Sequence, residues 1–395
     1  MPANAIKYPK ETLLVNWVTF SPVGHAIEAF KVANAWRHAG LEISVALNHK
    51  SAVELAQCLD WLKQVYPINL NEFEVEGMPS ETLNAIPRRW DYVFTDPRIR
   101  KNSDWPALDR FHNAFRKHVQ AAHVNTGNDC QGFPTRKAAP LKLVLPESSK
   151  IFARGFINAE VSVRISLLFG TGTGSGCRNP PLSFWQELIK CLIRNFGDIE
   201  IILIGALGVE RTRTLNVNVE VLRSIENAFP QVRNAFDLGL LNQLAIAELC
   251  HLHISPHTGM STAVQCVGTP WLVLSGGEYW EYVFNGVPFV SIYPNCSRYP
   301  CTNLPNAEER EMLPECRTAI ETGATYLCMR EHELTSRIPE ILDAASRLIN
   351  KKRPYFRAIN EHYQFLLDRI GEPEPGSALL HDWPEVLTEE FANAQ

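Results

Sequence analysis

The sequence lacks any apolar run near the roughly 18 residues that a membrane-spanning helix requires. It also lacks a basic excess, because 38 Lys and Arg stand against 43 Asp and Glu and give a net charge of −5. A nucleic-acid or anionic-membrane partner therefore has little electrostatic support. We expect a protein that has no transmembrane segment and does not bind nucleic acid.

Two further absences concern targeting and phosphate-binding motifs. The N-terminus has no apolar core of a signal peptide, so we expect a cytoplasmic protein whose ten cysteines stay reduced. The G-x-G-x-x-G and Walker Gly-Lys-Ser/Thr spacings are missing, which excludes the usual dinucleotide and P-loop sites. No Asp-x-Asp pair that would hold a metal with a diphosphate occurs.

Short apolar runs alternate with helical spacing along the whole chain. Expected strands cover residues 13–18, 43–47, 92–95, 163–169, 200–204, 253–255 and 271–274. Expected helices cover residues 27–36, 52–62, 184–195, 219–229, 245–249, 340–350 and 355–370. Such alternation predicts the α/β class, with parallel sheets covered by helices on both faces.

The length of 395 residues favours two domains. Residues 126–160 are rich in Gly, Pro, Lys and Ser without sustained periodicity, which indicates a linker. We predict an N-terminal Rossmann-like domain over 1–160, a C-terminal one over 161–335, and helices with a tail over 336–395. Two doubly wound domains would face a cleft lined by the carboxyl ends of strands, where ligands of such folds bind.

A glycine-rich loop directly follows the strand expected over 163–169. Its backbone N–H groups and short hydroxyls suit phosphate oxygens, and an arginine at its end would add charge-assisted hydrogen bonds. A flexible turn without a ligand is the alternative. The candidate phosphate-binding residues are Thr171, Gly172, Thr173, Gly174, Ser175 and Arg178.

A second polar loop follows the strand expected over 253–255. Ser261 can cap the helix that comes next, so that the helix N-terminus points at an anion. Structural capping alone is the alternative. The candidate residues are His257, Thr258, Gly259, Met260 and Ser261.

Four of the ten cysteines fall within 33 residues, in the pattern Cys296-x4-Cys301-x14-Cys316-x11-Cys328. Four thiols in a reducing compartment suit tetrahedral coordination of Zn or Fe. Such a site would be structural, because four protein ligands leave no open position. Four unrelated buried thiols are the alternative.

Two residues that follow expected strands, the strand over 13–18 and the strand over 92–95, are candidates for a catalytic base. His25 lies in a Gly-bearing turn at the start of a helix, and a histidine titrates near neutrality. Asp96 at the end of its strand is the second candidate. An ordinary helix-terminus role for His25 remains open.

Four motifs in their order along the chain resemble the donor-binding half of the bacterial heptosyltransferases, glycosyltransferase family 9 with the GT-B fold. They are the glycine-rich loop, Ile204-Gly205 with Glu210, the Ser-Pro-His-Thr-Gly-Met-Ser-Thr motif and Gly268-Thr-Pro270. The resemblance covers about residues 160–330. It implies that a nucleotide sugar binds there, with the following contacts. Thr171, Thr173 and Arg178 would meet phosphates, Glu210 the ribose, and Thr258 and Gly259 the diphosphate.

The cysteines resemble the iron-binding insert of heptosyltransferases that modify autotransporter proteins. Three positions depart from the family. His257 and Thr262 stand where the family has Asp and His. The family's proposed base in the first loop, an Asp, falls near Ser21 and Pro22, while His25 keeps the family's histidine.

These observations predict a glycosyltransferase that moves a sugar from a nucleoside diphosphate sugar to a hydroxyl acceptor, with inversion and without a catalytic metal. The acceptor could be a secondary metabolite, a peptide or protein side chain, or a lipid-linked glycan. A sugar-nucleotide epimerase and a catalytically inactive binding scaffold are the alternatives. A homo-oligomer remains open.

Overall fold

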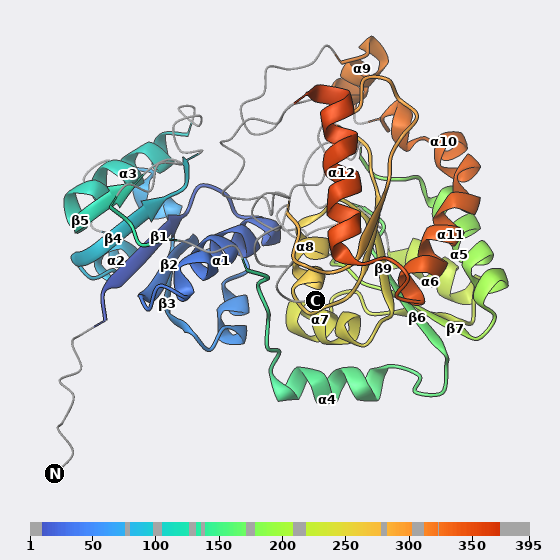
Figure 1. Cartoon of the computed structure of the whole chain (residues 1–395), viewed down its shortest axis with the longest axis horizontal. Coiled ribbons are helices and arrows are strands. Elements are labelled where there is room, and N and C mark those ends of the chain that lie inside the picture. The colour runs from blue at the N-terminus through green and yellow to red at the C-terminus, as the bar shows by residue number, and fades with distance from the viewer. Residues whose placement is uncertain are drawn as a thin grey trace. The chain divides into compact units, whose positions relative to one another are not determined.

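The computed structural model describes residues 10–75, 80–97, 105–125, 132–135, 139–170, 178–207, 219–277, 283–301, 312–322 and 324–371. The chain divides into two compact units, Met1–Leu141 and Lys142–Gln395. Figure 1 shows a parallel sheet with flanking helices in each of them. The predicted α/β class is confirmed.

The first unit contains a five-stranded parallel sheet in the order β3-β2-β1-β4-β5. Its strands are β1 (Thr12–Trp17), β2 (Glu42–Asn48), β3 (Leu62–Ile68), β4 (Arg89–Thr95) and β5 (Gln120–Asn125). Its helices are α1 (Val23–Arg37), α2 (Glu81–Asn84) and α3 (Pro106–His118), with 3-10 turns over Val53–Cys58 and Leu70–Phe73.

Alternate residues of β1 build two apolar layers, one on each face of this sheet. On one face Leu14 and Val18 pack in a buried cluster with Phe111 and Phe115 of α3. On the other face the Trp17 ring stacks near Phe94, with centroids 6.3 Å apart. Burial on both faces follows from the period of two along a strand.

The second unit contains a six-stranded parallel sheet in the order β11-β10-β9-β6-β7-β8. Its strands are β6 (Val163–Leu167), β7 (Ile199–Leu203), β8 (Val232–Asn234), β9 (Leu252–Pro256), β10 (Trp271–Leu274) and β11 (Phe289–Ile292). Its helices are α4 (Glu147–Phe156), α5 (Leu182–Phe196), α6 (Val219–Ala228), α7 (Leu240–Glu248), α8 (Gly259–Gln265), α9 (Pro314–Thr322), α10 (Glu331–Ser336), α11 (Ile338–Ile349) and α12 (Tyr355–Ile370), with a 3-10 turn over Leu327–Met329.

The structure corrects two sequence predictions. The helix expected over 52–62 is a 3-10 turn, Val53–Cys58, followed by the unpredicted edge strand β3, whose side chains are mostly exposed or half-buried. The stretch 126–160 predicted as a linker contains α4, which belongs to the second unit and packs against α7. The buried residues of α4 are the small Ser149 and Ala153, four positions apart, whereas its large apolar residues Ile151 and Phe152 are exposed, so the apolar residues did not mark the buried face.

Both sheets have a point where the strand order reverses direction. In the first unit β1 pairs with β4, and Asn16 lies opposite Thr95. In the second unit β6 pairs with β9, and Leu167 lies opposite Ile254. Open α/β sheets bind ligands at the carboxyl ends of the strands on either side of this point. We therefore expect a ligand-binding site to involve the loops after β1, β4, β6 and β9.

None of the helices that the structure describes is long and apolar enough to cross a bilayer.

Candidate functional site

The glycine-rich loop of the second unit is anchored at both of its described ends. The Trp185 indole N–H donates to the Phe169 carbonyl oxygen at 3.0 Å, directly after β6. The Asn179 side chain fills the space beside Gly170, because a Cβ atom placed there would lie 2.5 Å from Asn179 Cγ. Residues 169–170 and 179 are thus held together at the end of β6. The predicted contacts Thr171, Gly172, Thr173, Gly174 and Ser175 lie outside the described residues.

The loop after β9 ends in a helix cap that differs from the predicted one. Thr258, not Ser261, is the N-cap of α8, and its Oγ1 accepts a hydrogen bond from the Ser261 backbone N–H at 3.1 Å. The predicted cap was wrong because α8 begins at Gly259, two residues before Ser261. Thr258 is 8% exposed and Ser261 is fully buried, so the Ser261 hydroxyl faces the protein interior.

A network of buried polar side chains holds the loop after β9 against the sheet. The His253 ring links Ser166 Oγ of β6, 3.0 Å from Nδ1, to Ser261 Oγ of α8, 3.2 Å from Nε2. The Ser255 and Ser261 hydroxyls lie 2.6 Å apart, and the Trp271 indole N–H donates to Ser255 Oγ at 2.9 Å. The network ties β6, β9, β10 and the first turn of α8 into one support. Sequence reasoning missed it, although polar residues inside buried strands were a visible signal.

Burial fixes the protonation state of this network. Desolvation lowers the pKa of His253 to about 3, so the ring is neutral in the folded protein at physiological pH. A neutral ring has one donor and one acceptor nitrogen, which suits a bridge between two hydroxyls.

The same burial predicts a loss of stability in acid. An unfolded histidine binds a proton below about pH 6.5 and the folded His253 does not, so its contribution falls by about 2 kcal/mol between pH 7 and pH 5. Urea unfolding at the two pH values measures this change. We expect His253→Gln to reduce the pH dependence by that amount, whereas the exposed His38→Gln leaves it unchanged. An identical pH dependence in His253→Gln and the parent protein would contradict the assignment.

The loop after β7 is held by a side-chain clamp. The Gln243 amide of α7 donates to the Gly205 carbonyl oxygen at 2.7 Å and accepts from the Gly205 N–H at 3.0 Å. Glu210, the predicted ribose contact, lies outside the described residues, which reach Leu207 in this loop.

In the first unit, His25 forms a pair that the sequence prediction did not include. His25 lies at the start of α1, and its Nδ1 is 2.7 Å from Glu28 Oε2. The ring stacks on Phe20 with centroids 4.6 Å apart, and the Trp17 indole N–H donates to the same Glu28 oxygen at 3.4 Å. Glu28 is 2% exposed and the His25 side chain 20% exposed. A neutral ring that donates from Nδ1 carries its acceptor lone pair on Nε2, which is the requirement for a base.

The second candidate base, Asp96, has a different environment. Asp96 follows β4 at the point where the strand order reverses, and its backbone N–H donates to the Asn16 carbonyl oxygen at 2.9 Å. The residue is fully buried. A base must reach the hydroxyl of an acceptor, so the partly exposed His25 meets this requirement better than Asp96 does.

The four clustered cysteines lie in one region of the second unit. Cys316 and Cys328 belong to one buried cluster with Tyr326 and Met329, and Cys296 packs against it. Burial, together with the nearby thiols of Cys296, Cys301 and Cys316, raises the pKa of Cys328 to about 12. All eight cysteines in the described part of the chain are free thiols. Among the described residues, no three His, Cys, Asp or Glu side chains are placed to hold a metal ion.

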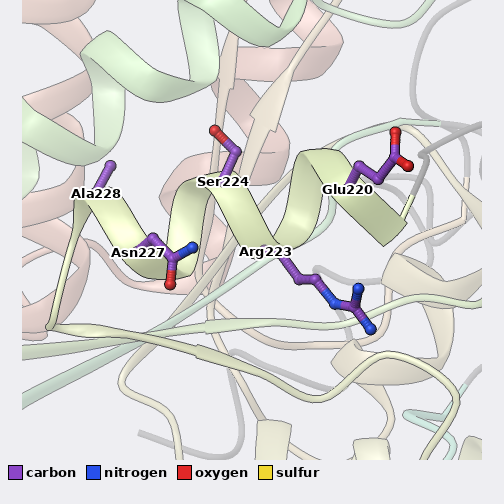
Figure 2. Close-up of a pocket in the computed structure, with 5 residues that line it drawn as sticks. All are labelled: Glu220, Arg223, Ser224, Asn227 and Ala228. Atoms are coloured by element: carbon purple, nitrogen blue, oxygen red, sulfur yellow. The ribbon is translucent and has the colours of Figure 1, made fainter.

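A surface hollow of about 600 Å³ lies elsewhere, along α6. Figure 2 shows the five residues that line it, which project from one helix: Glu220, Arg223, Ser224, Asn227 and Ala228. No predicted site residue lines this hollow.

Comparison with solved structures supports the fold. The E. coli ADP-heptose LPS heptosyltransferase II structure has a TM-score of 0.56 at 14% identity, covering 86% of this chain and 99% of that one. The glycosyl transferase family 9 structure from Veillonella parvula also has a TM-score of 0.56, at 12% identity, covering 88% and 100%. No family model matches the chain, and no curated protein matches its sequence significantly. The protein therefore has a GT-B-like fold, as predicted.

Two other matches have lower scores. The iron-containing dodecameric glycosyltransferase TibC from enterotoxigenic E. coli has a TM-score of 0.44 at 10% identity, covering 86% of this chain and 80% of that one. The UDP-N-acetylglucosamine 2-epimerase structure from Listeria monocytogenes has 0.39 at 14% identity, covering 93% and 99%. These scores are too low to support an inference about metal content or reaction.

Proposed function

We propose that the protein is a glycosyltransferase that moves a sugar from a nucleoside diphosphate sugar to a hydroxyl acceptor. One observation carries the proposal. The two loops predicted to contact the diphosphate follow β6 and β9, which are adjacent parallel strands at the point where the strand order reverses. Both loops therefore leave the same edge of the sheet side by side. The likeness in fold to a heptosyltransferase agrees with this function.

In this proposal, the diphosphate of the nucleotide sugar is held by a positive charge and by backbone hydrogen-bond donors. Arg178 supplies a cation at the end of the glycine-rich loop, with Thr171 and Thr173 beside the phosphates. Thr258 and Gly259 contribute hydroxyl and backbone contacts from the other loop, with His257 and Met260 beside them, while the buried Ser261 supports Thr258 through its N–H. Glu210 contacts the ribose. Fixed donors of this kind stabilise the negative charge that the leaving diphosphate gains in the transition state.

His25 acts as the base in a single displacement. The acceptor oxygen attacks the anomeric carbon while the bond from that carbon to the diphosphate oxygen breaks, and its electron pair leaves with the diphosphate. The acceptor proton passes to His25 Nε2. Glu28 holds the ring through Nδ1 at 2.7 Å and stabilises the imidazolium that forms. Attack from the face opposite the leaving group inverts the anomeric centre.

The four cysteines bind a structural Zn or Fe in this proposal. The described side chains are not arranged as a ligand set, so the proposal rests on the chemistry of the donors: four thiols can complete a tetrahedral site, and three of them are under 9% exposed. Metal analysis of the purified protein tests the assignment. We expect about one ion per chain, lost in Cys316→Ser and retained in Cys191→Ser, which changes a thiol outside the cluster. The assignment would be contradicted if the purified parent protein contained no metal and had the same melting temperature as Cys316→Ser.

A thermal-shift screen tests the donor class. Ligands that bind only the folded state raise its melting temperature, by about 2.7 kcal/mol of stabilisation at 100 times Kd. We expect nucleoside diphosphates and their sugars to raise Tm and free nucleosides to do so less. No response to any nucleoside diphosphate or its sugar would contradict the proposal and favour the inactive scaffold.

A nucleotide-release assay then separates the transferase from an epimerase. A transferase releases nucleoside diphosphate faster when an acceptor is supplied. An epimerase converts the sugar nucleotide without one, so conversion that is independent of acceptor would contradict the transferase.

A further inference from the structure

Arg178 rests against the backbone of Gly277, the second residue of a glycine pair, Gly276 and Gly277, that follows β10. A Cβ atom placed on Gly277 would lie 2.5 Å from Arg178 Cγ and 2.7 Å from Cδ. Gly277 also has a φ of +86°, a conformation that favours glycine. The aliphatic stem of Arg178 therefore occupies the space that a side chain would fill in any other residue.

The cysteine-bearing segment Tyr326–Met329 supports the same glycine pair. The Gly277 N–H donates to Cys328 Sγ at 3.2 Å. A Cβ atom on Gly277 would lie 3.3 Å from Tyr326 Cε2, and one on Gly276 would collide with Met329 Sδ. Tyr326, Cys328 and Met329 are all under 9% exposed. Gly277 is thus packed between the cysteine-bearing segment and Arg178, and Gly276 packs against Met329 of that segment.

We propose that Gly277 and Cys328 are positioning residues for Arg178, so that the cysteine-bearing segment sets the geometry of diphosphate binding. An arginine side chain carries about 2 kcal/mol of rotamer entropy. A stem that is already ordered by packing loses less of this freedom when a ligand binds, which raises affinity. The proposal rests on the donor role assigned to Arg178 above, and it extends that role to a segment distant in sequence.

Inorganic pyrophosphate is the probe, because it tests the diphosphate site without a base or sugar. Calorimetric titration should show about tenfold weaker binding in Gly277→Ala and in Cys328→Ala, and a larger loss in Arg178→Ala. In the Arg178→Ala background neither second substitution should weaken binding further. This non-additivity distinguishes positioning from general destabilisation.

A matched control separates backbone strain from contact. Gly239 has a φ of +81° but no atom within 4 Å of its added Cβ, so Gly239→Ala imposes similar strain without touching Arg178. We expect its pyrophosphate affinity to be unchanged. Cys328→Ala tests the support without backbone strain if Gly277→Ala does not fold, and Cys316→Ser, which also removes one of the four clustered thiols but not the hydrogen bond from Gly277, is its control.

The outcomes distinguish the two proposals. If Arg178→Ala weakens pyrophosphate binding and the Gly277 and Cys328 variants bind like the parent, positioning is overturned and the donor site stands. If Gly277→Ala and Cys328→Ala weaken pyrophosphate binding as much in the Arg178→Ala background as in the parent protein, positioning is overturned as well. If Arg178→Ala binds pyrophosphate like the parent, both the donor role of Arg178 and its positioning are overturned.

Discussion

His25→Gln is expected to lower kcat by about 10²–10⁴-fold, because glutamine cannot accept the acceptor's proton. The side chain is only 20% exposed and is bonded to the buried Glu28, but a glutamine amide can keep that hydrogen bond, so the loss in the free energy of unfolding should stay within about 1–3 kcal/mol. Initial rates with saturating donor and acceptor measure the effect. Added imidazole should restore part of the rate in His25→Gln, since a small base can take the place of the missing ring.

Glu28→Gln provides the companion measurement. A glutamine amide can donate to Nδ1, which moves the ring proton to Nε2 and removes the acceptor lone pair there. The rate should therefore fall although His25 is still present, and the double variant should be no slower than His25→Gln. Glu28 is 2% exposed, so circular dichroism and urea unfolding must show a folded variant first. The exposed His38→Gln serves as the control. Full activity in His25→Gln would remove His25 as the base and leave Asp96.

Arg178→Ala is expected to lower kcat/KM by about 10²–10³-fold. The guanidinium offers fixed, charge-assisted hydrogen bonds to phosphate oxygens, and alanine leaves the leaving diphosphate's charge unmatched. Nucleoside diphosphate affinity should fall with it, measured by calorimetry. The matched control is Arg223→Ala, which removes an exposed arginine from the α6 hollow in Figure 2. A similar loss in both variants would indicate a general charge effect and contradict a specific role for Arg178.

Strong local patterns made much of the fold predictable. The strands β1, β9 and β10 are fully or almost fully buried, and β6 is buried over residues 165–167, so their hydrophobic signal was clear. Their alternation with helices was enough to predict parallel sheets. The edge strand β3 escaped prediction for the opposite reason. β3 includes Lys63 and Gln64, which are exposed, and Pro67, so it resembles a loop in composition.

From the sequence, the candidate site could be predicted only to the level of the loops that form it. Sequence order located the segments after β6 and β9, because motif spacing is visible in a sequence. It could not identify Glu28 as the partner of His25, since a Glu three residues along a helix is common and only burial gives it meaning. The contact of Arg178 with Gly277 joins residues 99 positions apart, and nothing local encodes it.

A crystal structure with a bound nucleoside diphosphate would test the central proposal most directly. The account predicts density for the diphosphate at the carboxyl ends of β6 and β9, with phosphate oxygens within hydrogen-bonding reach of Arg178 and of the Thr258–Gly259 segment. Density for the nucleotide at the α6 hollow, or anywhere else with both loops empty, would contradict it.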